Sequence, residues 1–515
     1  MEKIKVNIVG SGIGGLYAGA ILSKHNFEVN VFEARTQIGG YNTSWKRKDY
    51  LFDTALHEIN GFYPDDNKLK FFRFLGLFDK LKFLKTGSPY TSLFNDFEFK
   101  VPHGFDNFKQ KLIETFPEEK KGIYKVLDTI RDTSLQTYGY LSEKTKFEAL
   151  KNTPTKYPKL MTGMLRTIYG LIWKNIKNPK LRTILGQLYN YYSDDIKKLN
   201  LIYFCATYSY INESYWISGT ASNLTDALKD IIIENGGKVL TRKKVNGVIF
   251  KDKKAIGIKV NEDEEYFSDI TIFNTPLKPT VENIIGKKNI PLINRIQAMN
   301  VKPSTSIFAL YVGLKIDVKD IGIKEFCYFL NEIDDLKDVR LKGKTISYEK
   351  RSLIVASYTL DNSLCEKGKS VVSICVIDNM ENWERLKNNK EEYKKEKDRI
   401  ANIIIDRVDR KFKGFKEAID VLEIGTPITM EKYSNNPGGA VYGACQRRSQ
   451  ANIFRFPNDI KNKNLYFAGA WVSPGGGLSG VMISGQETVK LILQKYKIDP
   501  LYEKFASPYP KEGYN

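Results

Sequence analysis

Three glycines and one glutamate near the start of the chain have the types and spacing of groups that hold phosphate and ribose. They lie in the segment VNIVGSGIGGLYAGAILSKHNFEVNVFEARTQIGG, residues 6–40. Gly10 permits a tight turn, Gly12 lets backbone approach a pyrophosphate without a Cβ, and Gly15 lets a helix lie close to a sheet. Glu33 follows the turn by about twenty residues, where a carboxylate accepts hydrogen bonds from both ribose hydroxyls. A glycine triplet alone fits an ordinary strand-to-helix turn, but the full set predicts a dinucleotide cofactor.

The elements that must position these groups follow from the same segment. A strand precedes the glycine turn, a helix covers about residues 14–24, and a second strand covers residues 28–32 and delivers Glu33. The helix then points its free N–H groups and the positive end of its dipole at the phosphates.

A second glycine-rich turn lies near the other end of the chain. Residues 465–496 read LYFAGAWVSPGGGLSGVMISGQETVKLILQKY, which predicts a buried strand, a turn at Gly475, Gly476 and Gly477, and an amphipathic helix. In a flavoprotein, this helix terminus suits the N1 and C2 carbonyl edge of the isoalloxazine, where negative charge accumulates on reduction. The alternative is a plain glycine turn.

Length and composition predict a cytoplasmic enzyme of several lobes. The chain has 515 residues, of which 42% are hydrophobic, and at about 150 residues per domain this suggests about three units. The five cysteines form no CxxC pair and no metal-ligand spacing, so we expect a reducing compartment and no metal site. We find no signal peptide and no run of about eighteen apolar residues.

The net charge of +20 has three explanations: nucleic acid, an anionic membrane surface, or a lysine-rich solvated face. Nucleic acid ranks last, because no nucleic-acid module is visible and the lysines are spread through the whole chain. We therefore expect no nucleic-acid partner.

The middle of the chain predicts further β-structure, and the fold class is α/β. Residues 238–275 predict three alternating strands and a return to an apolar strand, a small meander inserted into an α/β sheet. Residues 304–314, 353–359 and 370–377 are rich in β-forming residues and predict a second sheet. Residues 381–412 alternate in charge sign and predict a solvent-facing surface helix.

Several of these segments together resemble one group of flavoproteins. The chain resembles the phytoene desaturase, carotenoid isomerase and retinol saturase group of amine-oxidase-like FAD proteins. The resemblance is carried at the amino-terminal end by VGSGIGGLYAG, FEAR and IGG, and at the carboxyl-terminal end by LYFAGAWVSPGGGLSGVMISG. Three segments between these ends extend the resemblance across nearly the whole chain: FDTALHEINGF, KPSTSIFALYVGL and TPITMEKYSNNPGGAVYG. Only the motifs at the two ends are specific to this group.

The resemblance implies a Rossmann-like FAD-binding domain of the amine-oxidase and GDI-like type, formed by residues 1–80, 216–290 and 425–500. A substrate-binding domain with a mixed sheet is implied for residues 81–115 and 291–424. Residues 116–215 are expected to form a helical lid or membrane-docking region.

The same resemblance implies which residues bind the cofactor. The ADP part is expected to contact Gly10, Gly12, Gly15, Glu33 and Arg35. The adenine is expected to pair with the backbone of Val245. Gly469, Gly480, Val481 and Met482 are expected along the ribityl chain and flavin, and the set of cofactor residues is completed by Gly14, Gly39, Gly40 and Gly476.

The chain departs from its relatives at three places. Many relatives carry arginine after the paired glycines, whereas Tyr41 follows here, as in members more like the isomerases and saturases. Many FAD proteins have a glycine followed by an acid on the second strand, and Gly469 and Ala470 stand at this position here. Backbone groups must therefore make the cofactor contacts that the acid makes in those proteins. His57 matches the histidine of FDxGxHxxG in saturase-like members, with Ala55 in place of glycine. His57 is the one catalytic candidate, and the alternative is a histidine hydrogen-bonded beneath the flavin without proton transfer.

Two segments suggest how a long apolar substrate would be handled. Aromatic residues crowd between positions 189 and 216, and we expect part of this run, including Tyr191, Tyr192 or Tyr208, to line a substrate tunnel; ordinary core packing is the alternative. Residues 156–182 carry seven lysines or arginines and no acid, with apolar residues at helical spacing. They predict an amphipathic helix at an anionic membrane, or else a helix packed over the substrate cavity.

The sequence therefore predicts an FAD-dependent oxidoreductase or redox-type isomerase that acts on carbon-carbon bonds of a carotenoid, retinoid, isoprenoid or unsaturated lipid. NAD(P)H is expected at most as a transient reductant, because no second glycine fingerprint is present. The alternatives are a flavin amine oxidase and a non-catalytic, GDI-like prenyl-binding protein. The sequence leaves open the substrate, the direction of the redox change and the oligomeric state.

Overall fold

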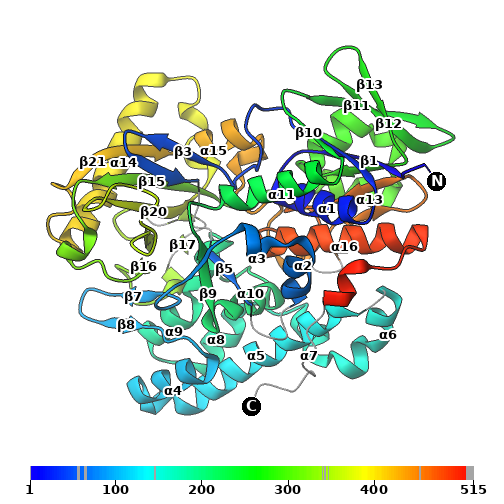
Figure 1. The fold of residues 1–515 in the computed structure, drawn as a ribbon. Coiled ribbons are helices and arrows are strands. Elements are labelled where there is room, and N and C mark those ends of the chain that lie inside the picture. The colour runs from blue at the N-terminus through cyan, green and yellow to red at the C-terminus, as the bar shows by residue number, and fades with distance from the viewer. Residues whose placement is uncertain are drawn as a thin grey trace.

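The computed structural model describes residues 2–54, 58–62, 67–143, 146–338, 340–341, 344–345, 347–451 and 454–505. Figure 1 shows three regions: a parallel sheet with its helices at the upper right, a second sheet at the upper left, and a group of helices below.

A six-stranded sheet contains the first strand of the chain. Its order is β10 (Lys238–Leu240), β2 (Glu28–Phe32), β1 (Lys5–Val9), β14 (Ile270–Phe273), β23 (Leu465–Phe467) and β22 (Asp459–Ile460). All pairs are parallel except β22 with β23. The apolar residues of the inner strands share a core with helices α1 (Ile13–Lys24), α11 (Ser222–Glu234) and α16 (Leu478–Tyr496). The predicted helix and second strand of the dinucleotide segment are confirmed.

The predicted meander is also confirmed. It consists of β11 (Val245–Lys251), β12 (Lys254–Val260) and β13 (Glu264–Phe267), all antiparallel. Asp252 and Lys253 join the first two strands with positive φ at both positions, as a two-residue hairpin turn requires. The short strand β10, which precedes the meander, belongs to the parallel sheet.

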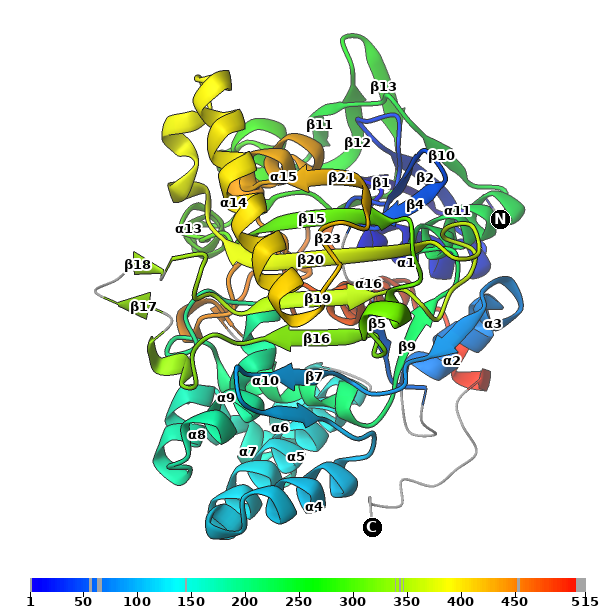
Figure 2. The ribbon, with the colours of Figure 1, turned by 90° about the vertical axis from the view of Figure 1, so that its left-hand side faces the viewer.

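A seven-stranded mixed sheet forms the second region, and Figure 2 views it face on. Its order is β21 (Ile419–Gly425), β15 (Ser306–Leu314), β20 (Ser370–Asp378), β19 (Leu353–Ser357), β16 (Cys327–Leu330), β7 (Thr91–Leu93) and β8 (Glu98–Lys100). This confirms the predicted second sheet and the α/β class with a mixed-sheet lobe.

The structure contains the surface helix predicted within residues 381–412, but one side of that helix is buried. Helix α14 (Lys390–Lys411) crosses the face of the seven-stranded sheet in Figure 2. It buries Ile400, Ile404 and Val408 in the core of that sheet. These residues recur every four positions, so they form one apolar stripe that the alternating charges obscured in the sequence.

The helical region contains α4 (Phe105–Thr115), α5 (Lys120–Ser142), α6 (Lys146–Lys156), α7 (Pro158–Gly163), α8 (Ile168–Asn175), α9 (Pro179–Gly186) and α10 (Leu201–Thr207). Two 3-10 helices, Gln187–Tyr191 and Tyr208–Ile211, flank α10. Buried side chains from this region and from the seven-stranded sheet form one core. In the described parts of the chain, no helix is both long enough and apolar enough to cross a bilayer.

The remaining elements connect these regions. They are β3 (Ser44–Arg47), β4 (Tyr50–Asp53), β5 (Glu58–Asn60), α2 (Asn67–Leu75), α3 (Leu77–Lys80), β6 (Phe83–Lys85), β9 (Ser214–Ile217), α12 (Leu277–Pro279), α13 (Leu292–Met299), β17 (Arg340–Leu341), β18 (Lys344–Thr345) and α15 (Pro427–Ser434). Strand β9 lies between β5 and β6 in a small sheet.

Candidate active site

A large pocket lies where the three regions meet. Its volume is about 1520 Å³, whereas a pocket for one drug-sized ligand usually measures about 300–1000 Å³. The parallel sheet contributes residues 10–14, the seven-stranded sheet contributes Ile307 and Ile354, and the helical region contributes Tyr191 and Tyr192. The pocket therefore has room for a dinucleotide and for a second ligand beside it.

The turn between β1 and α1 excludes side chains at its glycines. Gly10 has a φ of +93°, and a Cβ on it would lie 2.6 Å from the main-chain oxygen of Asn274. A Cβ on Gly15 would lie 2.7 Å from the oxygen of Gly10, and one on Gly14 would lie 2.8 Å from Cα of Gly469. Because each of these neighbours is backbone and cannot rotate away, the turn requires glycine at all three positions.

Asn274, directly after β14, fills the space beneath this turn. Its side-chain nitrogen donates a hydrogen bond of 3.4 Å to the oxygen of Gly10. A Cβ on Gly12 would lie 2.7 Å from the same nitrogen, and one on Gly469 would overlap the side-chain oxygen. The glycine at position 12 therefore leaves room for Asn274 in addition to any phosphate. Sequence reasoning missed Asn274, because no motif surrounds it.

Helix α1 presents an uncapped amino terminus to the pocket. Its N-cap residue is Gly12, which has no side chain to accept the first N–H groups, and its first turn contains no acid. Residues 10–14 line the pocket at this point. Free N–H groups and the positive end of the helix dipole attract an anion, so this end of the pocket suits a pyrophosphate.

Glu33 lines the same end of the pocket and is held in place by local donors. Its Oε2 accepts hydrogen bonds from the backbone nitrogen of Ser11 at 3.1 Å and from Ser11 Oγ at 2.6 Å. Its Oε1 accepts one from the backbone nitrogen of Arg35 at 2.9 Å. A carboxylate fixed in this way is oriented for further donors, such as ribose hydroxyls.

The other residues expected at the ADP part also line the pocket. Arg35 reaches across it, and its guanidinium donates to the main-chain oxygen of Lys432 and to Oδ1 of Asn435. Val245 lines the pocket where the meander begins. Gly39 and Gly40 both have positive φ, and the nitrogen of Gly39 donates to the oxygen of Ser11, which ties this second loop to the glycine turn.

Helix α16 presents a second uncapped amino terminus to the same pocket. Gly477 is its N-cap with a φ of +83°, no side chain caps the helix, and the first turn contains no acid. Gly477, Leu478 and Val481 line the pocket. Two helix dipoles therefore point into one cavity, one at each of the two predicted glycine turns.

Five of the expected residues lie behind the pocket wall: Gly15, Gly469, Gly476, Gly480 and Met482. A Cβ on Gly476 would lie 2.8 Å from Cα of Tyr442, and one on Gly480 would lie 2.8 Å from the oxygen of Gly475. Met482 is fully buried in the core of the parallel sheet. These residues shape the wall through packing.

Tyr41, which follows the paired glycines, lines the pocket and bonds to the last residue of α15. Its hydroxyl donates to Ser434 Oγ at 3.0 Å and lies 3.3 Å from the main-chain oxygen of Ala440. Burial raises the pKa of this hydroxyl to about 12. Tyr41 is therefore neutral and contributes no charge to a bound anion. His57 lies outside the described residues.

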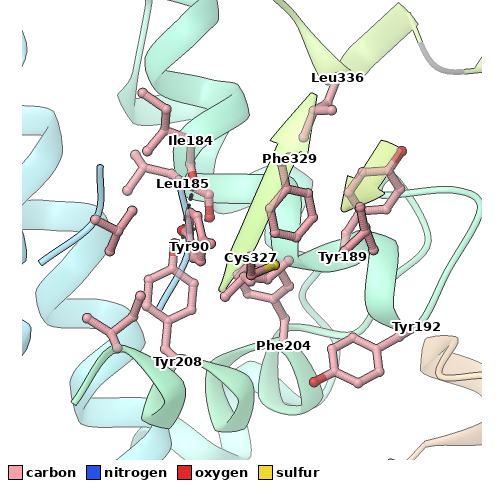
Figure 3. Packing of buried hydrophobic residues seen from close by; sticks show 14 of the residues in the cluster. Tyr90, Ile184, Leu185, Tyr189, Tyr192, Phe204, Tyr208, Cys327, Phe329 and Leu336 are labelled. Carbon is pink, nitrogen blue, oxygen red and sulfur yellow. Dashed lines mark hydrogen bonds between the residues drawn. The ribbon is translucent and has the colours of Figure 1, made fainter. Parts of the chain in front are cut away.

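The aromatic run divides between the pocket and the core. Tyr191, Tyr192 and Tyr210 line the pocket, and burial raises the pKa of each hydroxyl well above its usual value, so all three are neutral. Tyr208 does not line it. Figure 3 shows Tyr208 in the packed interior, where its hydroxyl donates to the main-chain oxygen of Leu185. The expectation that Tyr208 lines a tunnel is wrong, because a main-chain acceptor holds it in the core.

The expectation of a single amphipathic helix over residues 156–182 is also wrong. Pro158, the cap at Thr167 and the cap at Asn178 divide the segment into α7, α8 and α9. Its isoleucines, Ile168, Ile172 and Ile176, are buried in the core. Only two of the apolar residues at helical spacing are exposed, Met161 by 48% and Leu165 by 68%.

Comparison with known proteins agrees with this geometry. The family model described as flavin containing amine oxidoreductase matches residues 13–493. The chain belongs to this family. It is similar to an all-trans-retinol 13,14-reductase of Danio rerio, with 26% identity over 94% of this chain and 86% of that protein. It is also similar to a chloroplastic prolycopene isomerase of an Oncidium hybrid cultivar, with 24% identity over 94% of this chain and 83% of that protein.

Solved structures show the same fold. A putrescine oxidase variant with redesigned cofactor binding has a TM-score of 0.65 and 13% identity, over 96% of this chain and 99% of that chain. The predicted resemblance to amine-oxidase-like flavoproteins is therefore confirmed, and the chain is a flavin-type oxidoreductase.

The pocket residues fit an FAD. Bare glycine backbone and an uncapped helix terminus meet at the turn after β1, Glu33 lies beside them, and a second uncapped terminus lies at α16. In FAD the pyrophosphate lies between the adenosine ribose and the electron-accepting ring, so the glycine turn suits the pyrophosphate, Glu33 the ribose and the α16 terminus the ring.

Replacing Gly476 with alanine tests the packing at the second terminus. The new Cβ would overlap the main chain of Tyr442, so α16 and the pocket wall would have to separate. We expect FAD affinity to fall about tenfold or more, since overpacking of this kind costs about 1–3 kcal/mol. Gly170→Ala is the matched control, because a Cβ there meets only Thr167 Oγ at 3.5 Å. Equal affinity of the two variants in a flavin titration would contradict the assignment.

Proposed function

We propose that this chain is an FAD-dependent oxidoreductase that desaturates, saturates or isomerises carbon-carbon bonds of a long apolar substrate. The class of substrate is a carotenoid, retinoid, isoprenoid or unsaturated lipid, which agrees with the names of the relatives above. One observation carries the proposal: the dinucleotide cradle opens directly into an apolar, aromatic end of the same pocket.

In this proposal the cofactor residues divide between two ends of FAD. The glycine turn, Glu33, Arg35 and Val245 hold the ADP part, and the α16 terminus with Val481 contacts the flavin. His57 stays a weak catalytic candidate. When bound, FAD supplies hydride or electron transfer at its N5 edge. Residues 1–80, 216–290 and 425–500 would form the cofactor domain, and residues 81–115 and 291–424 the substrate domain.

The apolar end of the pocket positions the substrate and excludes water. Ile307 and Ile354 line it from the seven-stranded sheet, and Tyr192 and Tyr442 pack edge to face with ring centroids 5.2 Å apart. A hydrocarbon chain needs no charged partner, so these walls bind it through the apolar surface that both bury on contact. They also hold a reacting bond near the cofactor without competing water. A transient NAD(P)H is proposed as the source of electrons where the reaction consumes them.

Truncating the aromatic wall tests the substrate site. We expect Tyr192→Ala to lower turnover of all-trans-retinol or prolycopene at least tenfold, because a large apolar contact is removed. Flavin content should stay at the wild-type level, since the proposal assigns the ADP part to the glycine turn after β1 and to Glu33, not to Tyr192. Tyr208→Phe is the control, because Tyr208 lies in the core. Loss of flavin from Tyr192→Ala, or peroxide release on adding putrescine, would oppose the proposal.

Membrane contact is proposed at the turn after α7. The exposed side chains of Met161 and Leu165 lie beside exposed Lys156, Lys159 and Arg166. Apolar groups with a basic rim bind an anionic interface, and the cytoplasmic leaflet is the anionic one. A peripheral, cytoplasmic location is therefore part of this proposal.

Liposome flotation measures this contact. We expect the wild-type protein to float with anionic vesicles at low salt, and the double variant Met161→Glu and Leu165→Glu to remain unbound. Ile233→Glu is the control, because Ile233 is also exposed but lies on α11. Flotation of the double variant at the wild-type level would remove this turn from the proposal.

A further inference from the structure

A carboxyl group is buried in the apolar end of the pocket. Glu58 lies on β5, lines the pocket and is only 6% exposed. Its side-chain Oε1 is fully buried and has no hydrogen-bond partner in the described parts of the chain. An unpartnered polar atom in such a place is costly unless it serves a ligand, so this group needs a functional explanation.

The groups that face Glu58 leave it uncharged. They are Tyr191 and Tyr210 from the 3-10 helices around α10, and Cys327 from β16. Burial raises the pKa of all three well above the usual values, so none carries charge at neutral pH. Burial alone raises the pKa of Glu58 to about 8. The carboxyl is therefore mostly protonated at neutral pH and is able to donate.

Glu58 lies beside the helix terminus assigned to the flavin. Asn60, two positions further along β5 and so on the same face of the strand, accepts a hydrogen bond of 2.6 Å from Ser479 Oγ in the first turn of α16. The hydroxyl of Tyr210 also holds the strand by donating to the main-chain oxygen of Glu58 at 2.9 Å. The acid is thus held near the reacting end of the pocket.

We propose that Glu58 is the acid that donates a proton to a carbon of the substrate double bond and takes it back in the reverse direction. This inference rests on the proposed function. In saturation, the O–H bond of Glu58 breaks and the π electrons of the double bond form a new C–H bond. A hydride from the reduced flavin supplies the second C–H bond, and Glu58 regains its proton from solvent. In desaturation, the Glu58 carboxylate would accept the proton from one carbon, and the hydride from the other carbon would pass to oxidised FAD.

The test uses FAD-loaded protein reduced with dithionite and supplied with all-trans-retinol or prolycopene. We expect Glu58→Gln to lower kcat at least about 100-fold, within the range of general acid catalysis, with KM changed by less than about threefold. In the wild type, kcat for saturation should fall as pH rises through about 8. Glu213→Gln is the matched control. Glu213 lies just before β9, pairs with Lys85 at 2.7 Å and stays outside the pocket lining.

A second readout does not depend on turnover. Infrared spectra of the loaded protein should contain a protonated carboxyl band that disappears as pH rises through about 8 and is missing from Glu58→Gln. Flavin content of the variant checks that it folds.

The outcomes separate the two proposals. Wild-type turnover with an unchanged Glu58→Gln rate overturns the role of Glu58 and leaves the proposed function standing. A wild type that converts neither polyene overturns the proposed function, and the donation step with it. A Glu58→Gln variant whose main defect is a higher KM for an amine would identify Glu58 as a cation anchor, and this also overturns the proposal.

Discussion

Arg455→Met is expected to destabilise the protein by about 3–5 kcal/mol and to release the flavin on mild heating. The guanidinium is buried and makes six hydrogen bonds within the described residues, each to an uncharged oxygen. These acceptors belong to two segments, residues 444–450 and residues 470–472. Methionine fills a similar volume but donates nothing, so several main-chain oxygens would lose their partner inside the protein.

The effect should reach the cofactor because both segments adjoin the flavin end of the pocket, where Tyr442 and Trp471 form part of the wall. Thermal unfolding followed by circular dichroism and by flavin fluorescence measures it. Burial lowers the pKa of Arg455 to about 10, so it stays charged at neutral pH, and Arg455→Lys should lose less stability because it keeps a charge and three donors. Equal stability of Arg455→Met and wild type would contradict this description.

Glu58→Gln is expected to have the opposite effect on stability at alkaline pH. The pKa of Glu58 rises on folding from 4.5 to about 8. Between these values the folded protein holds a proton that the unfolded chain has released, so wild-type stability falls as pH rises through this window. At about 1.4 kcal/mol per pH unit, the loss amounts to roughly 5 kcal/mol above pH 8. Glutamine does not titrate, so the free energy of unfolding of the variant should rise relative to that of the wild type by this amount as pH rises through the window.

Chemical unfolding at pH 5.5 and pH 8.5 measures the difference. The gap between Glu58→Gln and wild type should widen at the higher pH, whereas Glu213→Gln should show no such widening because Glu213 lies in a surface ion pair. Parallel pH dependences of wild type and Glu58→Gln would show that the Glu58 carboxyl ionises as easily in the folded protein as in the unfolded chain.

Local patterns were sufficient to predict the cofactor end of the site. Gly15 is required by a backbone contact with Gly10 in the same short segment, and the strand after α1 carries Glu33 to the pocket. Such features depend on neighbours in sequence, so type and spacing reveal them. The strands of the second sheet were predictable for the same reason, because continuous apolar runs indicate strands buried on both faces.

Features set by tertiary packing were not predictable. The isoleucines of residues 156–182 have helical spacing whether they face a membrane or a protein core, and only the fold shows that Ile168 and Ile172 are buried. Gly476 resembles a flavin contact in sequence, but its partner is the backbone of Tyr442, far from it along the chain. Glu58 lies in the FDTALHEINGF segment, but that segment does not reveal its burial, because the groups that face it, Tyr191, Tyr210 and Cys327, come from distant parts of the chain.

Binding of FAD by the purified protein tests the central claim most directly. Titration of the protein with FAD, followed by flavin fluorescence and by equilibrium dialysis, should give one tightly bound FAD per chain. The Gly476→Ala variant should bind it at least about tenfold more weakly. A folded protein that binds no FAD, oxidised or reduced, would contradict the assignment of the pocket and every reaction proposed for it.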